Sequence, residues 1–220
     1  RAFFGDANLP QARWLDAFSE IGTAHPQVPV LDSFPEQSDH RRLRVFWMGH
    51  LLARLFQERP DLVVMPAAFR AAWESQPVNP EAWINAAQSE LGAVAHALDE
   101  TERKLDSQGE TIFAAYDMLD RIGLTRPDIR GRCIGALLAL WLSLSQRYRR
   151  LRAKIFLRDD LLDAGELGFA DASKLRGYSA ALEWDVASLY RLVVRHFAEA
   201  SPELRAWLGR VKGGPTLDEH

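Results

Sequence analysis

The sequence TIFAAYDMLDR, residues 111–121, joins an apolar run of strand length to a turn that contains two acids. The run is bounded by a glycine and by Asp117, so the pattern predicts a buried strand over Thr111–Tyr116. A second apolar run, Ala153–Leu157, ends directly before Arg158. We therefore expect two core strands, each followed by charged residues.

A long helix is predicted between these strands, from about Pro127 to Arg149. Its central part, Cys133 to Leu144, is apolar nearly all round, which is typical of a buried helix. A strand, a buried helix and a second strand form a βαβ unit, and such a unit implies a parallel sheet flanked by helices. Because two strands cannot form this sheet alone, we expect others from a weak segment such as Val28–Leu31 or from chain outside this sequence.

Helix signals dominate the rest of the chain. They combine apolar residues at helical spacing with N-cap residues, first-turn prolines and stop signals. The predicted helices lie over residues 9–21, from Ser38 to before Pro60, from Asn79 to about Leu105, from about Asp185 to Ala198 and from Ser201 onward. The expected fold class is therefore α/β by its core and predominantly helical, with a partial parallel sheet of few strands.

Composition and charge bound the function without identifying it. The chain has 220 residues, is 47% hydrophobic and 26% charged, and has a formal net charge of -3, so nothing attracts it globally to nucleic acid or an anionic membrane. Its single cysteine excludes an internal disulfide and a cysteine-based zinc cluster, which favours a cytoplasmic location. The longest uncharged apolar run, Cys133 to Gln146, is too short to span a bilayer, so no membrane partner is expected.

The acids after the first strand are the strongest candidates for chemistry. Asp117 lies at the carboxyl end of a predicted parallel strand, where ligands bind in open α/β sheets, and Asp120 follows in the same turn. Arg158 follows the second strand, and its guanidinium could contact a phosphate group through two hydrogen bonds. The alternatives are an ordinary solvated turn for the acids and a surface ion pair of Arg158 with Asp159 or Asp160.

The same residues resemble a known group of ATPases. The stretch Asp117-Met-Leu-Asp-Arg121 is similar to the D-D-L-D-R Walker B element of the KAP and STAND branches of P-loop ATPases. The segment Lys154–Asp160 looks like the next core strand, whose end in these proteins often bears a sensor-type arginine. The resemblance covers roughly residues 110–197 and implies a P-loop NTPase-like core.

The resemblance also implies roles for individual residues. Asp117 and Asp120 would hold Mg²⁺ beside the phosphates of bound ATP, and Arg158 would act as the sensor. Lys174 would approach the nucleotide, although a plain solvated loop is the simpler interpretation of its surroundings. The implied partner is a nucleotide, and the implied function is that of a nucleotide-dependent switch or a slow ATPase.

Two departures from the family pattern bear on activity. No G-x-x-x-x-G-K-[ST] sequence occurs in this chain, so the loop that cradles the phosphates would lie upstream of Arg1. Binding of ATP and Mg²⁺ is therefore conditional on a Walker A loop outside this sequence. Met118 stands where many relatives carry a second acid, the candidate base for hydrolysis, so either Asp120 takes that role or hydrolysis is slow. Binding and hydrolysis are thus separate expectations.

On this interpretation the chain has three parts. Residues 1–106 form a helical insert or subdomain, residues 107–200 form the Walker B, helix and sensor-strand part of the core, and residues 201–220 form a C-terminal helix with a flexible tail. The alternative is a non-catalytic helical scaffold that binds a protein partner or a second copy of itself. The basic stretch from Arg147 to Lys154 also leaves a nucleic-acid contact open, next to the simpler interpretation as favourable charge at a helix end.

Overall fold

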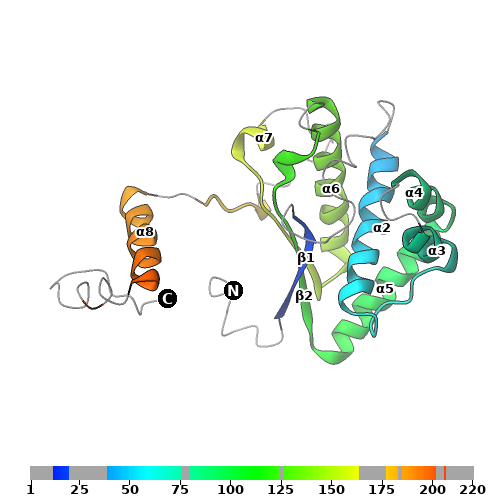
Figure 1. Cartoon of the computed structure of the whole chain (residues 1–220). Coiled ribbons are helices and arrows are strands. Elements are labelled where there is room, and N and C mark those ends of the chain that lie inside the picture. The colour runs from blue at the N-terminus through cyan, green and yellow to red at the C-terminus, as the bar shows by residue number, and fades with distance from the viewer. Residues whose placement is uncertain are drawn as a thin grey trace. The chain divides into compact units, whose positions relative to one another are not determined.

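The computed structural model describes residues 12–19, 39–75, 80–123, 126–163, 177–182, 185–201 and 206. The chain divides into a large unit, residues 6–176, and a small unit made of residues 1–5 and 177–220. The large unit combines a small parallel sheet with helices, so the coarse prediction of a predominantly helical α/β chain is confirmed (Figure 1). Likeness to a P-loop NTPase fold stays a prediction.

The sheet has three strands among the residues that the structure describes. They are β1 (Ala12–Phe18), β2 (Thr111–Tyr116) and β3 (Leu151–Ile155). The middle strand is β2, and both of its pairings are parallel, with Ala12 opposite Thr111 and Ile112 opposite Leu151. The carboxyl ends of the three strands therefore lie at one edge of the sheet.

Helices connect the strands and cover the sheet. In chain order they are α2 (His40–Glu58), α3 (Ala67–Ser75), α4 (Pro80–Ser89), α5 (Leu91–Gln108), the short 3-10 helix η2 (Leu119–Arg121), α6 (Pro127–Arg147) and α7 (Asp159–Asp163). Figure 1 shows α2, α5 and α6 on the same side of the sheet, with α3 and α4 beyond α2. The connections from β1 to β2 and from β2 to β3 move in the same direction across the sheet. Because such connections between parallel strands are right-handed, their helices lie on the same face.

The prediction of a helix over residues 9–21 is wrong, because Ala12–Phe18 forms strand β1. A short apolar pattern fits the helix and strand periods almost equally, and here pairing with the buried strand β2 decides the outcome. Arg54 of α2 supports the strand by donating from Nε to the carbonyl oxygen of Asp16, at 3.0 Å, where the ladder is irregular. The other predicted strand, Val28–Leu31, lies outside the described residues.

The ends of α2 follow from its capping residues. Asp39, rather than the predicted Ser38, caps the helix, because its Oδ1 accepts a hydrogen bond from the backbone N of Arg42 at 2.7 Å. Ser38 lies outside the described residues. The helix ends at Glu58, before Pro60, as predicted.

The single helix predicted from Asn79 to Leu105 is divided at Glu90 into α4 and α5. Glu90 Oε2 accepts a hydrogen bond from the backbone N of Phe69 at 2.9 Å, so the residue at the break satisfies the first turn of α3. The helix α3 is absent from the predicted elements. It occupies a proline-rich joint, and only Phe69 and Trp73 of its residues are buried.

The start of β3 is set by Glu102 of α5. Its carboxylate accepts hydrogen bonds from the backbone N–H groups of Arg149, Arg150 and Leu151, at 2.6, 2.9 and 2.8 Å. Successive amides directed at one carboxylate form an anion-binding nest within the chain. For this reason the strand begins at Leu151, earlier than the predicted Ala153.

A cluster of buried aromatic side chains joins the helices to the sheet. Trp47 of α2 donates from Nε1 to the carbonyl oxygen of Cys133 on α6, at 2.8 Å. The ring of Trp47 also lies edge-on to Tyr116 of β2, with the ring centroids 5.8 Å apart. The cluster consists of Phe18, Phe46, Trp47, Phe69, Trp73, Trp83, Tyr116 and Trp141. Packing of this kind gives the large unit one continuous core.

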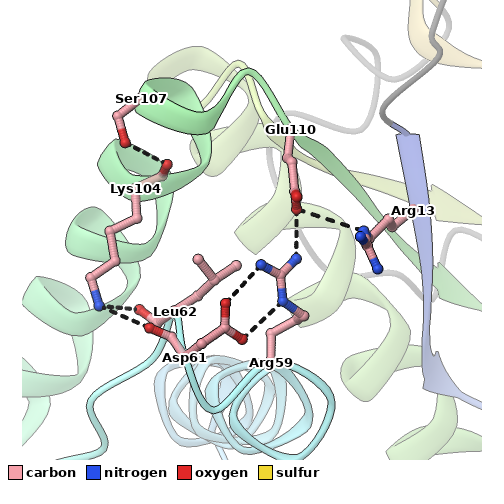
Figure 2. A network of polar contacts seen from close by, with 7 residues as sticks. All are labelled: Arg13, Arg59, Asp61, Leu62, Lys104, Ser107 and Glu110. Atoms are coloured by element: carbon pink, nitrogen blue, oxygen red, sulfur yellow. Dashed lines mark hydrogen bonds and ion pairs between the residues drawn. The ribbon is translucent and has the colours of Figure 1, made fainter.

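A network of ion pairs closes the amino-terminal end of the sheet. Figure 2 shows Arg59, which follows α2, between Asp61 and Glu110. Arg59 contacts Glu110 at 2.6 Å and Asp61 at 2.8 Å, and Arg13 of β1 lies 3.7 Å from the same Glu110. Lys104 of α5 donates to a backbone carbonyl of the same loop at 2.8 Å. Hydrogen bonding to Arg59 lowers the pKa of Asp61 below its ordinary value, so these charges satisfy one another.

The small unit contains helix α8 (Val186–Ala200), and the predicted helix over Asp185 to Ala198 is confirmed. Asp185 caps it by accepting a hydrogen bond on Oδ1 from the backbone N of Ser188, at 2.6 Å. Most of the predicted helix from Ser201 onward lies outside the described residues. Across the segments that the structure describes, no helix has the length and apolar character needed to cross a membrane.

Burial predicts that Cys133 is chemically inert in the folded protein. The side chain is fully buried, and this burial raises the pKa of its thiol to about 12, so almost no reactive thiolate exists near neutral pH. We expect iodoacetamide to leave the native protein unmodified in mildly alkaline buffer and to modify the cysteine in denaturant, as followed by mass spectrometry. Rapid modification of the native protein would contradict the packing of α6.

Replacing Glu102 with alanine should destabilise the large unit by about 2 kcal/mol, because three backbone N–H groups lose their shared acceptor. Urea unfolding measures the loss. The control is Glu100→Ala on the same helix, whose side chain pairs with the exposed Arg103 and should cost less than about 0.5 kcal/mol. Equal losses for the two variants would show that Glu102 does not set the start of β3.

Candidate ligand site at the carboxyl edge of the sheet

The carboxyl edge of the sheet is formed where β2 and its neighbours end. Asp117 N donates to the carbonyl oxygen of Phe18 at 2.8 Å, and Phe156 N donates to that of Tyr116 at 2.9 Å. These hydrogen bonds extend the ladder past the ends of the strands. Asp117 therefore lies between the ends of β1 and β3, and its side chain is exposed. Parallel sheets bind ligands at this position.

The turn after β2 presents Asp120 at the surface. Met118 has a left-handed backbone, with φ 57° and ψ 30°, which side chains other than glycine adopt infrequently. Its backbone N donates to Asp117 Oδ1 at 2.7 Å. Leu119 and Ile122 are buried and anchor the turn in the core. Backbone strain of this kind is concentrated at ligand sites, so the turn merits a functional interpretation.

Arg158 reaches this turn from the end of β3. Its Nη1 lies 3.9 Å from Asp120 Oδ2. The guanidinium also donates to both oxygens of Asp160, at 3.1 and 3.0 Å, so the surface ion pair considered from the sequence is formed as well. The Arg158 side chain is 67% exposed, and pairs this exposed are worth less than about 1 kcal/mol. A bound anion can therefore replace Asp160 at little cost.

An open polar pocket lies beside these side chains, with a volume of about 440 Å³. That volume falls within the range of small-molecule sites. Its walls come from η2, from the first turn of α6, from α7 and from Arg158, which directly precedes α7. The lining residues are Asp120, Arg121, Arg130, Arg158, Asp160 and Leu161. Three of these six side chains are guanidiniums, so the pocket differs from an apolar ligand cleft.

The structure brings together some of the predicted site residues. Asp120 and Arg158 meet at the pocket, whereas Asp117 lies in the same turn but not in the lining. Lys174 lies outside the described residues. Sequence reasoning missed Arg130. The sequence did contain a signal for this residue. Arg130 lies in the first turn of the helix after Asp117, and a helix that follows a strand in a parallel sheet begins at the carboxyl edge.

The donor set for a metal ion is small. Asp117 and Asp120 offer carboxylate oxygens, which Mg²⁺ prefers, but Asp120 already lies beside Arg158. Within the described ranges, no group of three or more histidine, cysteine, aspartate or glutamate side chains is placed to hold a metal ion. Mg²⁺ commonly combines one or two carboxylates with water and substrate phosphates. The residues therefore suit Mg²⁺ only together with a phosphate-bearing ligand.

The side chain that precedes Asp117 belongs to the core rather than to the site. Tyr116 is fully buried and lies edge-on to Trp141, with ring centroids 6.1 Å apart. Burial raises the pKa of the Tyr116 phenol well above its ordinary value, so the phenol stays neutral. Acid–base chemistry at this edge would have to use the carboxylates.

Two arginines of the basic stretch at the end of α6, Arg147 and Arg150, form ion pairs within the protein. Arg147 Nη2 contacts the two carboxylate oxygens of Asp99 at 2.8 and 2.9 Å, and Arg150 Nε contacts Asp106 at 2.9 Å. Both acids lie on α5, on either side of Glu102 in sequence and at helical spacing from it. These pairs favour a role in packing β3 against α5 over a nucleic-acid contact, which stays a prediction.

Gly123→Ala should destabilise the turn between η2 and α6 by about 2 kcal/mol. Gly123 has a φ of 58°, and a Cβ there would lie 2.7 Å from the carbonyl oxygen of Arg126. The control is Gly92→Ala in α5, where a Cβ meets nothing within 4 Å and alanine should stabilise the helix by about 0.5–1 kcal/mol. The measurement is the unfolding temperature of both variants. Similar changes for the two substitutions would contradict a strained backbone at Gly123.

Known proteins provide no guide to this site. No model of a protein family, no curated protein and no solved structure matches the chain. The residues at the carboxyl edge of the sheet are therefore the basis for any functional assignment.

Proposed function

We propose that the carboxyl edge of the sheet is the metal-and-sensor half of a nucleotide site, and that the protein is a nucleotide-dependent switch or slow ATPase. The resemblance of the segment from Asp117 to Arg121 to a Walker B element suggests the nucleotide. The proposal requires a glycine-rich G-K-[ST] loop from chain outside this sequence, because residues 1–220 contain none.

One observation carries the proposal. Asp120 and Arg158 follow two neighbouring parallel strands and meet, 3.9 Å apart, at a polar pocket on the carboxyl edge of the sheet. In open α/β sheets this edge is where phosphate-bearing ligands bind. An acid and a cation at adjacent strand ends also match the chemistry of a phosphate with its metal ion.

At such a site the two acids would bind the metal ion and Arg158 would bind the phosphate. Asp117 has an exposed carboxylate that can orient a water ligand of Mg²⁺, and Asp120 adds a second acceptor from the same turn. When bound, the ion neutralises the charge of the phosphates. Arg158 exchanges its ion pair with Asp160 for a bidentate contact with a phosphate group, so the position of this guanidinium reports the state of the nucleotide.

Met118 separates binding from hydrolysis. A carboxylate at this position could accept a proton from an attacking water, whereas a thioether cannot. Its backbone N is already bonded to Asp117 Oδ1, which fixes the direction of the Asp117 carboxylate. A switch that binds nucleotide and hydrolyses it slowly is therefore the form of the proposal that these residues support best.

A second candidate function, a protein-interaction module, is favoured by α8. The helix carries apolar side chains at i, i+3, i+4, i+7 and i+11, which places them on one face. These residues are Val186, Leu189, Tyr190, Val193 and Phe197, and all are exposed. A helix of this kind suits a hydrophobic groove on a partner protein or on a second copy of the chain.

Mg²⁺-ATP should raise the unfolding temperature of the full-length protein that supplies the phosphate loop. At ten times its dissociation constant, a ligand that binds only the folded state stabilises it by about 1.4 kcal/mol, or about 3–6 °C for a domain of this size. Asp117→Asn should reduce the shift, because it weakens the metal contact. The control is Glu74→Gln, an exposed acid on α3, which should leave the shift unchanged. An unchanged unfolding temperature at millimolar Mg²⁺-ATP would contradict the proposal and favour the interaction module.

A further inference from the structure

The pocket contains one guanidinium, that of Arg130, that no other residue described in the structure contacts through a hydrogen bond or an ion pair. Arg130, in the first turn of α6, lines the pocket. In the part of the chain that the structure describes, no hydrogen bond or ion pair engages its guanidinium. By contrast, Arg132 on the same helix donates to Asp128 at 2.9 Å, and Arg158 is bonded to Asp160. Arg130 is therefore available to a ligand without the loss of an existing contact.

The charges around the pocket favour an anion. Its lining holds the guanidiniums of Arg121, Arg130 and Arg158 against the carboxylates of Asp120 and Asp160. Both carboxylates lie beside Arg158, so they do not neutralise the side of the pocket that α6 forms. An excess of guanidinium groups disfavours a free divalent cation and favours an oxyanion that accepts several N–H donors.

The position of Arg130 is fixed by the core. Its neighbour Ile129 is fully buried, and the backbone N of Arg130 donates to the carbonyl oxygen of Arg126 at 3.2 Å. Gly123 packs so closely against this turn that a Cβ there would lie 3.4 Å from the Cβ of Arg130. A guanidinium on a rigid helix is pre-organised, so it loses less freedom on binding than one on a loop.

We propose that Arg130 is a phosphate-binding residue and that this pocket binds a phosphoryl group directly. Arg130 holds one side of the group through its planar fork, and Arg158 approaches from the other side after leaving Asp160. The proposal rests on the proposed function in naming a nucleotide as one source of the group, but the contact itself requires neither Mg²⁺ nor the glycine-rich loop. Free pyrophosphate is the second source, and the volume of about 440 Å³ accommodates either.

Titration of the full chain with pyrophosphate, without metal ions, tests the contact by calorimetry. Arg130→Gln should weaken binding at least about tenfold, because the variant keeps most of the side chain but removes the charged fork. The matched control is Arg132→Gln, which lies on the same helix outside the pocket and should bind as the wild type does. Circular dichroism and the unfolding temperature establish that both variants are folded. Absence of binding to the wild-type chain, or equal affinities for wild type and Arg130→Gln, would overturn the proposal.

A second pair of measurements separates this inference from the proposed function. ATP with and without Mg²⁺ is titrated into the full-length protein, its Asp117→Asn variant and its Arg130→Gln variant. If Arg130→Gln weakens both ATP and pyrophosphate, the nucleotide is a source of the phosphoryl group and both proposals stand. If pyrophosphate binding depends on Arg130 while Mg²⁺-ATP does not bind, the phosphate contact stands and the nucleotide function falls. If Mg²⁺-ATP binding depends on Asp117 but not on Arg130, the role of Arg130 is refuted.

Discussion

Parallel pairing of β2 with a strand on each side is the constraint on which the rest of the large unit depends. Parallel neighbours cannot be joined by a tight turn, so each pairing requires a crossover that contains helices. The first crossover holds α2 to α5 and the second holds α6. Both lie on the same side of the sheet, where Trp47 joins α2 to α6 through the carbonyl oxygen of Cys133 (Figure 1).

The two ends of the sheet use charge differently. At the amino-terminal end, Arg59 is held between Asp61 and Glu110, and the acids and bases there have partners within the protein (Figure 2). At the carboxyl end, Arg130 faces a pocket without such a partner among the described residues. Satisfied charges stabilise a fold, whereas an unsatisfied one on a rigid element leaves interaction energy for a ligand. This contrast supports the proposal that a ligand binds at the carboxyl end of the sheet.

Local patterns were enough to predict some elements but not others. The strand β2, the helix α6 and the position of Asp117 at a strand end follow from a short apolar run, a long one and the acid between them, and all are observed. Strand β1 could not be predicted, because its pairing partner lies far along the chain and its own pattern fits a helix. Only some of the pocket residues could be predicted. Asp120 and Arg158 follow the two predicted strands directly, whereas Arg130 reaches the pocket because of the direction in which α6 packs on the sheet.

The order of the strands along the chain has a kinetic consequence. Ile112 pairs with Leu151 across the short segment that contains η2 and α6. Ala12 pairs with Thr111 across a much longer segment that includes α2, α3, α4 and α5, so closing this second loop costs more conformational entropy. The β2–α6–β3 segment is accordingly the more local folding unit, and we expect it to form before β1 joins the sheet. The contact between Arg13 and Glu110 requires β1, whereas Asp120 and Arg158 follow β2 and β3. The candidate site is thus built on the part of the sheet that we expect to form first.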